Sequence, residues 1–337
     1  MTPGRSAMSR VAVARLSIAV VALSGAAITA RTSYEPRFGS WTRLNDARPI
    51  LTPRGTGFEA RGVFNPAVVH DGRRFVMLYR AQDARGVSTI GLATSQDGIR
   101  FDRESRPVLA PEAPYERGGG VEDPRLVRIG DRWYLTYTAY NGTDAQLALA
   151  VSPDLRRWDR RGVIMPANRG RWNVHWTKSG AILDARIAGR YWMYYMADAA
   201  NGYDQTGIAW STDLTTWTEA LDGPVLPRRP GRFDSRVVEP GPPPVLTDEG
   251  ILLVYNGADD GLTYRTGWAL FDAKDPTRLL ARSDRPIFEP ATDWERRGQV
   301  PNVVFIEGLV RTGSRWLFYY GGADTSVGVA EAHSVGR

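Results

Sequence analysis

The strongest constraint on the fold is a pattern that occurs five times along the chain. Each copy holds an apolar strand, a turn rich in Gly or Asp, and an aromatic strand that ends in a polar loop. A third strand follows in every copy, and a fourth closes four of them. Tyrosines of the second strands recur every 57 to 65 residues, at Tyr79, Tyr137, Tyr194, Tyr255 and Tyr320. Four short antiparallel strands repeated at this spacing are typical of propeller blades.

The two ends of the chain complement each other. The fifth copy stops after its third strand because the chain ends at Arg337. Residues 41–53 read like the outer strand of the other copies. We therefore predict an all-β, five-bladed β-propeller whose ring is closed by the N-terminal strand, which completes the last blade. A pair of β-sandwiches is the alternative.

The first thirty residues differ from the repeats. Arg10 and Arg15 precede an apolar run, residues 16–30, that ends in small side chains and contains no acid. This order is typical of a secretory signal peptide, and the run is short for a membrane span. We expect residues 1–30 to be removed near Ala30, leaving residues 31–337 as one exported, periplasmic or secreted propeller domain without stable membrane association. An uncleaved membrane anchor is the alternative.

Composition excludes several classes of partner. The net charge is +6, of which +3 belongs to arginines of the leader, and the remaining arginines are scattered rather than clustered. We therefore expect no nucleic acid partner. The chain lacks cysteine, and its histidines, His70, His175 and His333, lie in three separate contexts. We expect no metal and no cofactor.

Polar residues occupy positions that a propeller would bring to one face. The first strand of each blade lines the central channel, and the loops after the second strands return to the same mouth. Uncompensated carboxylates in such a funnel are costly, so a fold that gathers them usually employs them. Paired carboxylates suit the cleavage of glycosidic bonds. The candidate catalytic residues are Asp123, Glu239 and, as a second carboxylate beside the base, Asp198.

The same argument gives candidate substrate contacts, namely Asn65, Arg80, Asp83, Arg125, His175, Lys178, Asn256 and Asp324. For any one of these residues the alternative is a turn cap or a salt bridge to a neighbour. His175 in particular is either a substrate contact or a structural residue. Exposed aromatic side chains could stack on sugar rings or belong to the core, and the candidates are Tyr140, Trp172, Trp176 and Tyr203.

Several motifs together resemble a known family. They are "FNPAVV", "LYRA", "GVEDPR", "YTAYNG", "EPGPPPVLTDEGILLVYNGAD" and "YYGGADTSVGVA". From about residue 64 to 332 the chain resembles glycoside hydrolase family 130, the β-mannoside phosphorylases and β-1,2-mannosidases. The resemblance implies a five-bladed propeller and an inverting attack on a β-mannosidic bond of a mannose-containing oligosaccharide. It implies that Asp123 is the general acid, acting through the sugar's 3-hydroxyl. It also places Asn65, Arg80 and Asp324 toward sugar and phosphate.

The attacking group follows from departures within the resemblance. Lys178 matches a phosphate-binding lysine, but Tyr195 and Met196 stand where phosphorylases tend to carry a His-Arg pair. Glu239 replaces a small residue, and a carboxylate there would repel phosphate. We therefore expect an exo-acting, β-1,2-mannosidase-like inverting hydrolase in which Glu239 activates water. One alternative is a phosphorylase that takes inorganic phosphate as co-substrate and releases mannose 1-phosphate. The other is a non-catalytic glycan-binding propeller.

Overall fold

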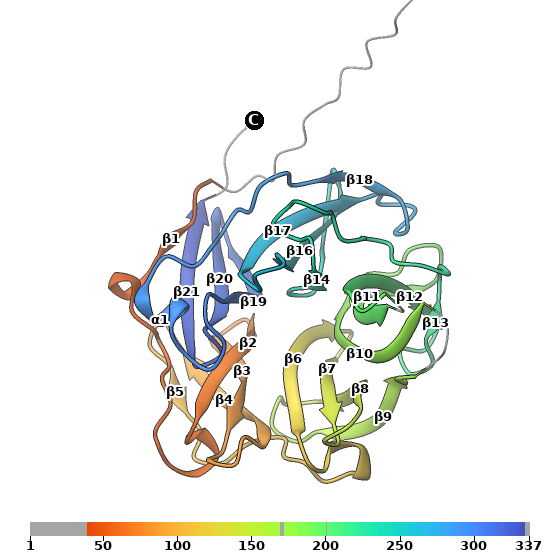
Figure 1. The fold of residues 1–337 in the computed structure, drawn as a ribbon. Helices are drawn as coiled ribbons and strands as arrows, with labels where there is room; N and C mark the ends of the chain where they lie inside the picture. Colours follow the sequence, from red (N-terminus) through yellow and green to blue (C-terminus); the bar gives the residue numbers. More distant parts are fainter. Residues whose placement is uncertain (1–38, 169–171, 200, 334–337) are drawn as a thin grey trace, which may run out of the picture. The chain divides into compact units, whose positions relative to one another are not determined.

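Antiparallel strands make up about half of the described chain (Figure 1). The structure is a computed structural model that describes residues 39–168, 172–199 and 201–333. The predicted leader, residues 1–30, lies outside the described residues. Within these ranges the chain forms 21 strands, three 3₁₀ turns (Asn45–Ala47, Gly57–Glu59 and Pro114–Glu116) and one short helix, α1 (Asp293–Arg296). No helix in these ranges is long and apolar enough to cross a membrane.

The strands form five consecutive antiparallel units. Unit 1 holds β2 (Gly62–His70), β3 (Phe75–Gln82), β4 (Ser88–Ser95) and β5 (Asp102–Arg103). Unit 2 holds β6 (Gly120–Ile129), β7 (Arg132–Tyr140), β8 (Ala145–Ser152) and β9 (Asp159–Met165). Unit 3 holds β10 (Asn173–Ile182), β11 (Tyr191–Ala199), β12 (Asp204–Ser211) and β13 (Thr218–Glu219).

The last two units vary this plan. In unit 4 the first strand is split into β14 (Val237–Pro240) and β15 (Val245–Thr247), followed by β16 (Gly250–Ala258), β17 (Tyr264–Phe271) and β18 (Leu279–Arg282). Unit 5 holds β19 (Val304–Thr312), β20 (Arg315–Gly322) and β21 (Ser326–His333). Its outer strand is β1 (Thr42–Arg43), which pairs with β21, and Leu51 makes a further bridge to Val327. The N-terminal segment therefore supplies the predicted outer strand of the last unit.

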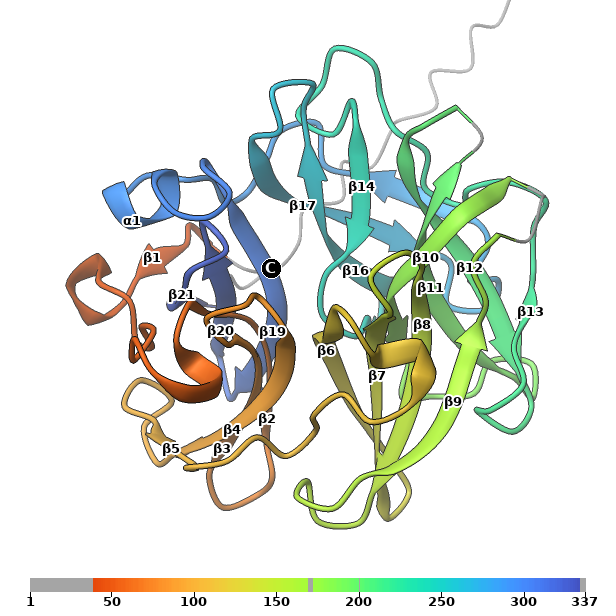
Figure 2. The same ribbon diagram turned by 60° about the horizontal axis from the view of Figure 1, so that its bottom comes forward.

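Hydrogen bonding joins the units into three sheets. A parallel contact between Ser88 and Gly120 links units 1 and 2, and one between Asp204 and Val237 links units 3 and 4. Unit 5, with β1, forms a separate four-stranded sheet. Among the described residues no sheet closes on itself. Figure 2 shows the first strands β2, β6, β10 and β19 facing the middle of the domain, where neighbouring first strands contact one another.

Apolar side chains fill the spaces between consecutive units. Each unit buries both of its faces, since alternate residues of a strand such as β3 belong to two different cores, and this gives five cores rather than one. Leu78 and Leu135 belong to the core between units 1 and 2, and the next three cores follow the chain order in the same way. The fifth core joins the two ends of the series, because Val63 of unit 1 packs with Leu317 of unit 5.

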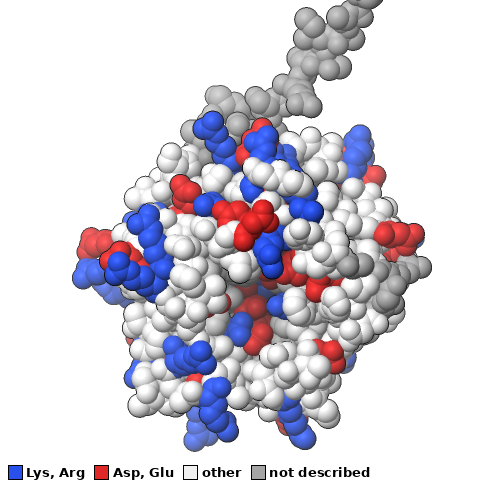
Figure 3. All heavy atoms as spheres, viewed as in Figure 1, with Lys and Arg blue, Asp and Glu red and all other residues white. Residues whose placement is uncertain are grey.

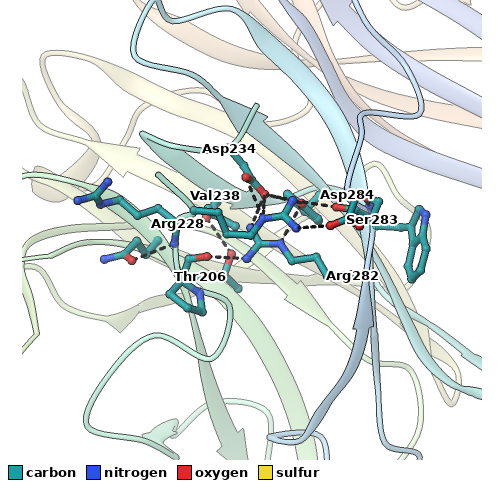
Figure 4. Close-up of polar contacts among 12 residues, drawn as sticks. Thr206, Arg228, Asp234, Val238, Arg282, Ser283 and Asp284 are labelled. Carbon is teal, nitrogen blue, oxygen red and sulfur yellow. Dashed lines mark hydrogen bonds and ion pairs between the residues drawn. The ribbon is translucent and has the colours of Figure 1, made fainter. Parts of the chain in front are cut away.

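A buried tyrosine–carboxylate–arginine group recurs in four units. In unit 2 the Tyr137 hydroxyl donates to Glu116 at 2.7 Å, and Arg160 of the outer strand donates to the same carboxylate at 3.0 Å. The equivalent groups are Tyr79, Glu59 and Arg103 in unit 1, Tyr255, Asp234 and Arg282 in unit 4, and Tyr320, Glu295 and Arg43 in unit 5. Figure 4 shows Arg282 beside Asp234. Each carboxylate is thus buried with a cation and hydrogen-bond donors, as burial of a charge requires.

Unit 3 departs from this pattern. In units 1, 4 and 5 the repeating tyrosine faces a glycine of the third strand; Tyr79, for example, faces Gly91, where a Cβ would lie 2.3 Å from the ring. In unit 3 the residue opposite Gly207 is Tyr195, whereas the predicted Tyr194 donates to a backbone carbonyl elsewhere. Tyr194 is a buried tyrosine of the second strand, as predicted, but its neighbour Tyr195 is the structural counterpart of Tyr79. Tyr195 donates to a carboxylate of the outer strand.

Candidate active site

Irregularities in the first strands turn polar side chains toward the middle of the domain. In each of the first strands β2, β6, β10 and β19, the pairing with the second strand is interrupted by a bulge. The residues left without a paired residue on the second strand include Asn65, Asp123, Ser179 and Glu307. The first three have positive φ angles of 50°, 50° and 56°, which non-glycine residues rarely adopt. A bulge re-aims a side chain and is common beside active sites. The repeated bulges therefore explain why these polar groups converge.

Asp123 lies in a dense polar network. Its Oδ1 accepts hydrogen bonds from Asn65 Nδ2 at 2.8 Å and from Arg80 Nη1 at 3.1 Å. The other arm of Arg80, Nη2, lies 2.5 Å from Glu122 Oε1, and Ser88 Oγ donates to the same oxygen at 3.1 Å. Asp123 and Glu122 are both buried. One arginine therefore spans two adjacent carboxylates.

The two carboxylates have opposite pKa shifts. Burial raises the pKa of Glu122, and this effect outweighs the opposing attraction of Arg80. Burial also acts to raise the pKa of Asp123, but Arg80, Arg125 and the Asn65 hydrogen bond lower it below the ordinary value. Of the two carboxylates, Asp123 is therefore the one that loses its proton more readily.

Glu239 enters the site from β14 and is 6% exposed. Ser179 Oγ donates a hydrogen bond to Glu239 Oε1. Burial raises the pKa of Glu239 above its ordinary value, although Arg125, Lys178 and the Ser179 hydrogen bond act to lower it. A carboxylate with a raised pKa is a stronger base once it is ionised.

Arg125 and Glu307 lie beneath these groups. Both are almost completely buried, and Arg125 Nη1 lies 2.8 Å from Glu307 Oε1. Arg125 also donates to the backbone carbonyls of Asp123, Pro240 and Gly241 at 2.9 to 3.1 Å. The structure therefore places Arg125 as a support of the site rather than at its surface. Sequence reasoning missed Glu307, although a glutamate in the apolar first strand "VVFIEGLV" is a visible signal.

Asp324 and Tyr264 complete the site from units 5 and 4. Asp324 has a φ of 50° and follows β20. Burial, with the nearby charges of Asp123, Glu239 and Glu122, raises the pKa of Asp324 to about 7, against the attraction of Arg80. Burial, and then the charge of Glu239, raise the pKa of Tyr264 above its ordinary value. Tyr264 was not predicted, and nothing in its sequence context distinguishes it.

In the site as a whole, carboxylates outnumber cations. We use the name central cluster for five carboxylates and three cations, which are Glu122, Asp123, Glu239, Glu307, Asp324, Arg80, Arg125 and Lys178. Each of these groups acts on at least one other electrostatically. Figure 3 shows acidic and basic atoms together in a depression in the middle of the domain. With all groups ionised, the excess disfavours binding of another anion.

Two predicted contacts have structural partners. Asp83 Oδ1 accepts bonds from the backbone N–H groups of Arg85 and Val87, both at 2.9 Å, and therefore holds its own loop. Asn256 is fully buried, and its amide exchanges hydrogen bonds of 3.0 and 2.8 Å with the backbone of Ile306 in β19. The structure thus gives Asp83 and Asn256 structural contacts rather than a place in the central cluster.

His175 and Asp198 form a pair outside the central cluster. His175 Nδ1 lies 2.7 Å from Asp198 Oδ2, and the imidazole is 57% exposed while Asp198 is buried. The neighbouring Trp176 donates through Nε1 to Asp204 at 3.0 Å, and its ring lies 5.0 Å from Lys178 Nζ. Asp198 is therefore paired with His175, and its role as a second carboxylate beside Glu239 stays a prediction.

Comparison with known proteins now decides the family. A family model described as β-1,4-mannooligosaccharide phosphorylase, that of glycoside hydrolase family 130, matches residues 41–335. The chain is a member of glycoside hydrolase family 130. A 1,2-β-oligomannan phosphorylase of Thermoanaerobacter sp. (strain X514) is 36% identical over 299 residues, which are 86% of this chain and 95% of the relative. A β-1,2-mannobiose phosphorylase of the same strain is 35% identical, over 86% and 96%.

A solved structure of this family gives a further comparison. It was reported with the statement that the family of mannoside phosphorylases contains glycoside hydrolases that target β-1,2-mannosidic linkages in Candida mannan. Its sequence is 36% identical to this chain, and the TM-score is 0.76. The match covers 87% of this chain and 94% of the solved one. The named curated relatives are phosphorylases. They agree better with the alternative of phosphorolysis than with the hydrolase that the sequence led us to expect.

Proposed function

We propose that the five units form a closed five-bladed β-propeller. The support is the set of five apolar cores, one between each pair of consecutive units, including the core shared by units 5 and 1. Blades of a propeller pack through side chains, so closure needs no hydrogen bonds between neighbouring sheets. In this arrangement the bulged first strands line one central channel, and the central cluster lies at its mouth.

We propose that the protein cleaves β-1,2-mannosidic bonds of mannose-containing oligosaccharides with inversion. Family membership and the names of the relatives support the substrate class. Inverting cleavage needs an acid for the leaving oxygen and an activated nucleophile on the opposite face of the sugar. The central cluster offers Asp123, with Asn65 and Arg80 to position it, and Glu239 on a different strand. Lys178 and Asp324 would bind the sugar.

Water is the acceptor that the geometry supports best. The observation that carries this choice is the buried Glu239 in a cluster where carboxylates outnumber cations. A phosphate dianion would have to displace or protonate these carboxylates, whereas water needs a base. Glu239 has the raised pKa of such a base. Burial is the main cause of that raised pKa, against the attraction of Arg125 and Lys178.

The proton for the leaving group has to reach Asp123 in the substrate complex. Arg80 and Arg125 favour the ionised form of Asp123. Asp324, with a pKa of about 7, is protonated in part of the molecules at neutral pH. A bound sugar excludes water and engages Arg80, and both changes raise the pKa of Asp123. Asp123 can therefore act as an acid only if substrate binding raises its pKa enough for it to take up a proton.

Phosphorolysis is the second candidate, and the curated relatives favour it. Lys178 and Arg80 supply two cations on the channel side, and the same Asp123 would act as acid. The two candidates differ only in the group that attacks the sugar. They therefore predict different products from one substrate.

The deciding experiment incubates the purified protein with β-1,2- and β-1,4-linked mannobiose, each with and without inorganic phosphate. Mannose and mannose 1-phosphate are measured separately. Mannose formed at the same rate with or without phosphate supports hydrolysis with Glu239 as base. Mannose 1-phosphate formed only with phosphate refutes hydrolysis and makes Lys178 and Arg80 the phosphate site. An Asp123→Asn variant that keeps full activity would refute the acid assignment in both cases.

Export stays a proposal that rests on residues 1–30. The charged, apolar and small-residue order of this segment supports cleavage near Ala30. N-terminal sequencing of the protein recovered from cells tests it. A mature chain that begins close to residue 31 agrees with export, and an intact Met1 contradicts cleavage.

A further inference from the structure

A pocket lies between units 2 and 3, at the strand that also carries Lys178 and Ser179. Its volume is about 400 Å³, and its lining includes Asp144, Asn168, His175, Trp176 and Asp198. His175 and Trp176 belong to β10, four and three residues before Ser179. At about 3.3 Å per residue, His175 lies roughly 13 Å along the strand from Ser179, which contacts Glu239. We call these five lining residues the outer subsite.

The outer subsite contains a buried acceptor that lacks a partner. Asp198 is 7% exposed and gives only Oδ2 to His175, while Oδ1 has no hydrogen-bond partner among the described residues. Buried carboxylate oxygens are normally satisfied, and an exception indicates a ligand or an ordered water. Because Asp198 lines the pocket, a hydroxyl group placed there would satisfy Oδ1.

His175 offers a second polar contact in the same pocket. Its Nδ1 is engaged by Asp198, so the tautomer with a proton on Nδ1 is favoured and Nε2, on the opposite side of the ring, is left for a ligand. The imidazole is 57% exposed, which makes it accessible. Trp176 lines the same pocket, its indole N–H is held by Asp204, and Lys178 lies over its ring. Two hydroxyl-binding groups beside a fixed aromatic ring are a set suited to a sugar.

We propose that the outer subsite binds a sugar residue on the leaving-group side of the oligosaccharide, beyond the bond that is cleaved. This inference rests on the proposed function, because Lys178 connects the pocket to the central cluster through Trp176. Asp198 Oδ1 and His175 Nε2 bind sugar hydroxyls, and Trp176 packs against the ring. The enzyme therefore prefers substrates longer than a disaccharide.

The test compares β-1,2-linked mannotriose with mannobiose. The ratio of the two kcat/KM values is measured for the wild type, His175→Ala and Asp198→Asn, with His70→Ala as the control because His70 lies at a distant hairpin turn. We expect the wild type to favour the trisaccharide and each subsite variant to lower the ratio about tenfold, the loss of one good hydrogen bond. The ratio for His70→Ala stays at the wild-type value. Unchanged ratios in both subsite variants, or no wild-type preference for the trisaccharide, would overturn the proposal.

A binding measurement separates failure of the subsite from failure of the proposed function. Calorimetry follows mannotriose binding to Asp123→Asn and to Asp123→Asn with His175→Ala, after thermal melting has confirmed that both are folded. Weaker binding in the double variant supports the outer subsite even if the wild type cleaves no mannoside. Cleavage by the wild type with equal binding by both variants retains the proposed function and refutes the subsite.

Discussion

Asp324 and Asp123 should respond to amide substitution with opposite effects on stability. The pKa of Asp324 in the folded protein is about 7, against an ordinary value of 3.8. Between these values the unfolded chain releases a proton that the folded protein keeps, so stability falls as pH rises from about 4 to about 7. The difference corresponds to at most about 4 kcal/mol, and we expect about 2 kcal/mol because part of the side chain is reachable by water.

Asp324→Asn removes this cost. Its advantage in free energy of unfolding over the wild type should grow from pH 4.5 to pH 7 and stay constant above. Asp123→Asn should do the reverse. The pKa of Asp123 is lowered in the folded protein, so the wild-type carboxylate stabilises the fold above pH 4, and this contribution is lost as pH falls below the ordinary value.

Urea unfolding followed by tryptophan fluorescence measures both variants. The buffers should lack phosphate, because an anion that binds only the folded protein would stabilise it. An Asp324→Asn variant whose difference from the wild type does not change with pH would refute the argument. So would an Asp123→Asn variant that is more stable than the wild type at neutral pH.

Three further predictions concern single contacts. Glu239→Gln should lose at least about 100-fold in turnover, measured as product release, yet melt at a higher temperature because a buried charge is removed. Arg43→Ala should lower the free energy of unfolding by about 3 kcal/mol or more, since it leaves a buried carboxylate unpaired, whereas Arg48→Ala, in an exposed pair, should cost less than about 1 kcal/mol. Gly91→Ala should cost about 1–3 kcal/mol in the same assay because its Cβ would meet a tyrosine ring, while Gly223→Ala, with open space, should be close to neutral.

The repeat was predictable because every copy carries the same alternation, which depends on burial and not on distant contacts. The outer strand at residues 41–53 was found by the same comparison, and β1 pairs with β21 as expected. The spacing does not distinguish Tyr194 from Tyr195, since both are buried in the same strand and either fits it. The glycine opposite shows that Tyr195 is the counterpart of Tyr79, and Gly207 could have been aligned with Gly91 in advance.

Site residues were harder to predict, since bulges leave no clear signal in a single sequence. The grouping of Asn65, Asp123 and Glu239 followed from topology, but the burial of Arg125 beneath them did not. Polar residues at equivalent positions can also be satisfied locally, as Asp83 is by its own loop. Conversely, Glu307 was overlooked because a lone acid in an apolar strand was read as part of the strand.

The pairing of β1 with β21 has a consequence for how the chain folds. Thr42 leaves the ribosome among the first described residues, whereas its partner Glu331 lies in β21, the last described strand. Contacts between such distant residues are slow to form because the loop between them must close first. Until β21 has been made, the face of unit 1 that packs against unit 5 and the segment around Leu51 remain uncovered. Completion of the last sheet is therefore a late step, and a chain cut short within β21 would expose apolar surface at both of its ends.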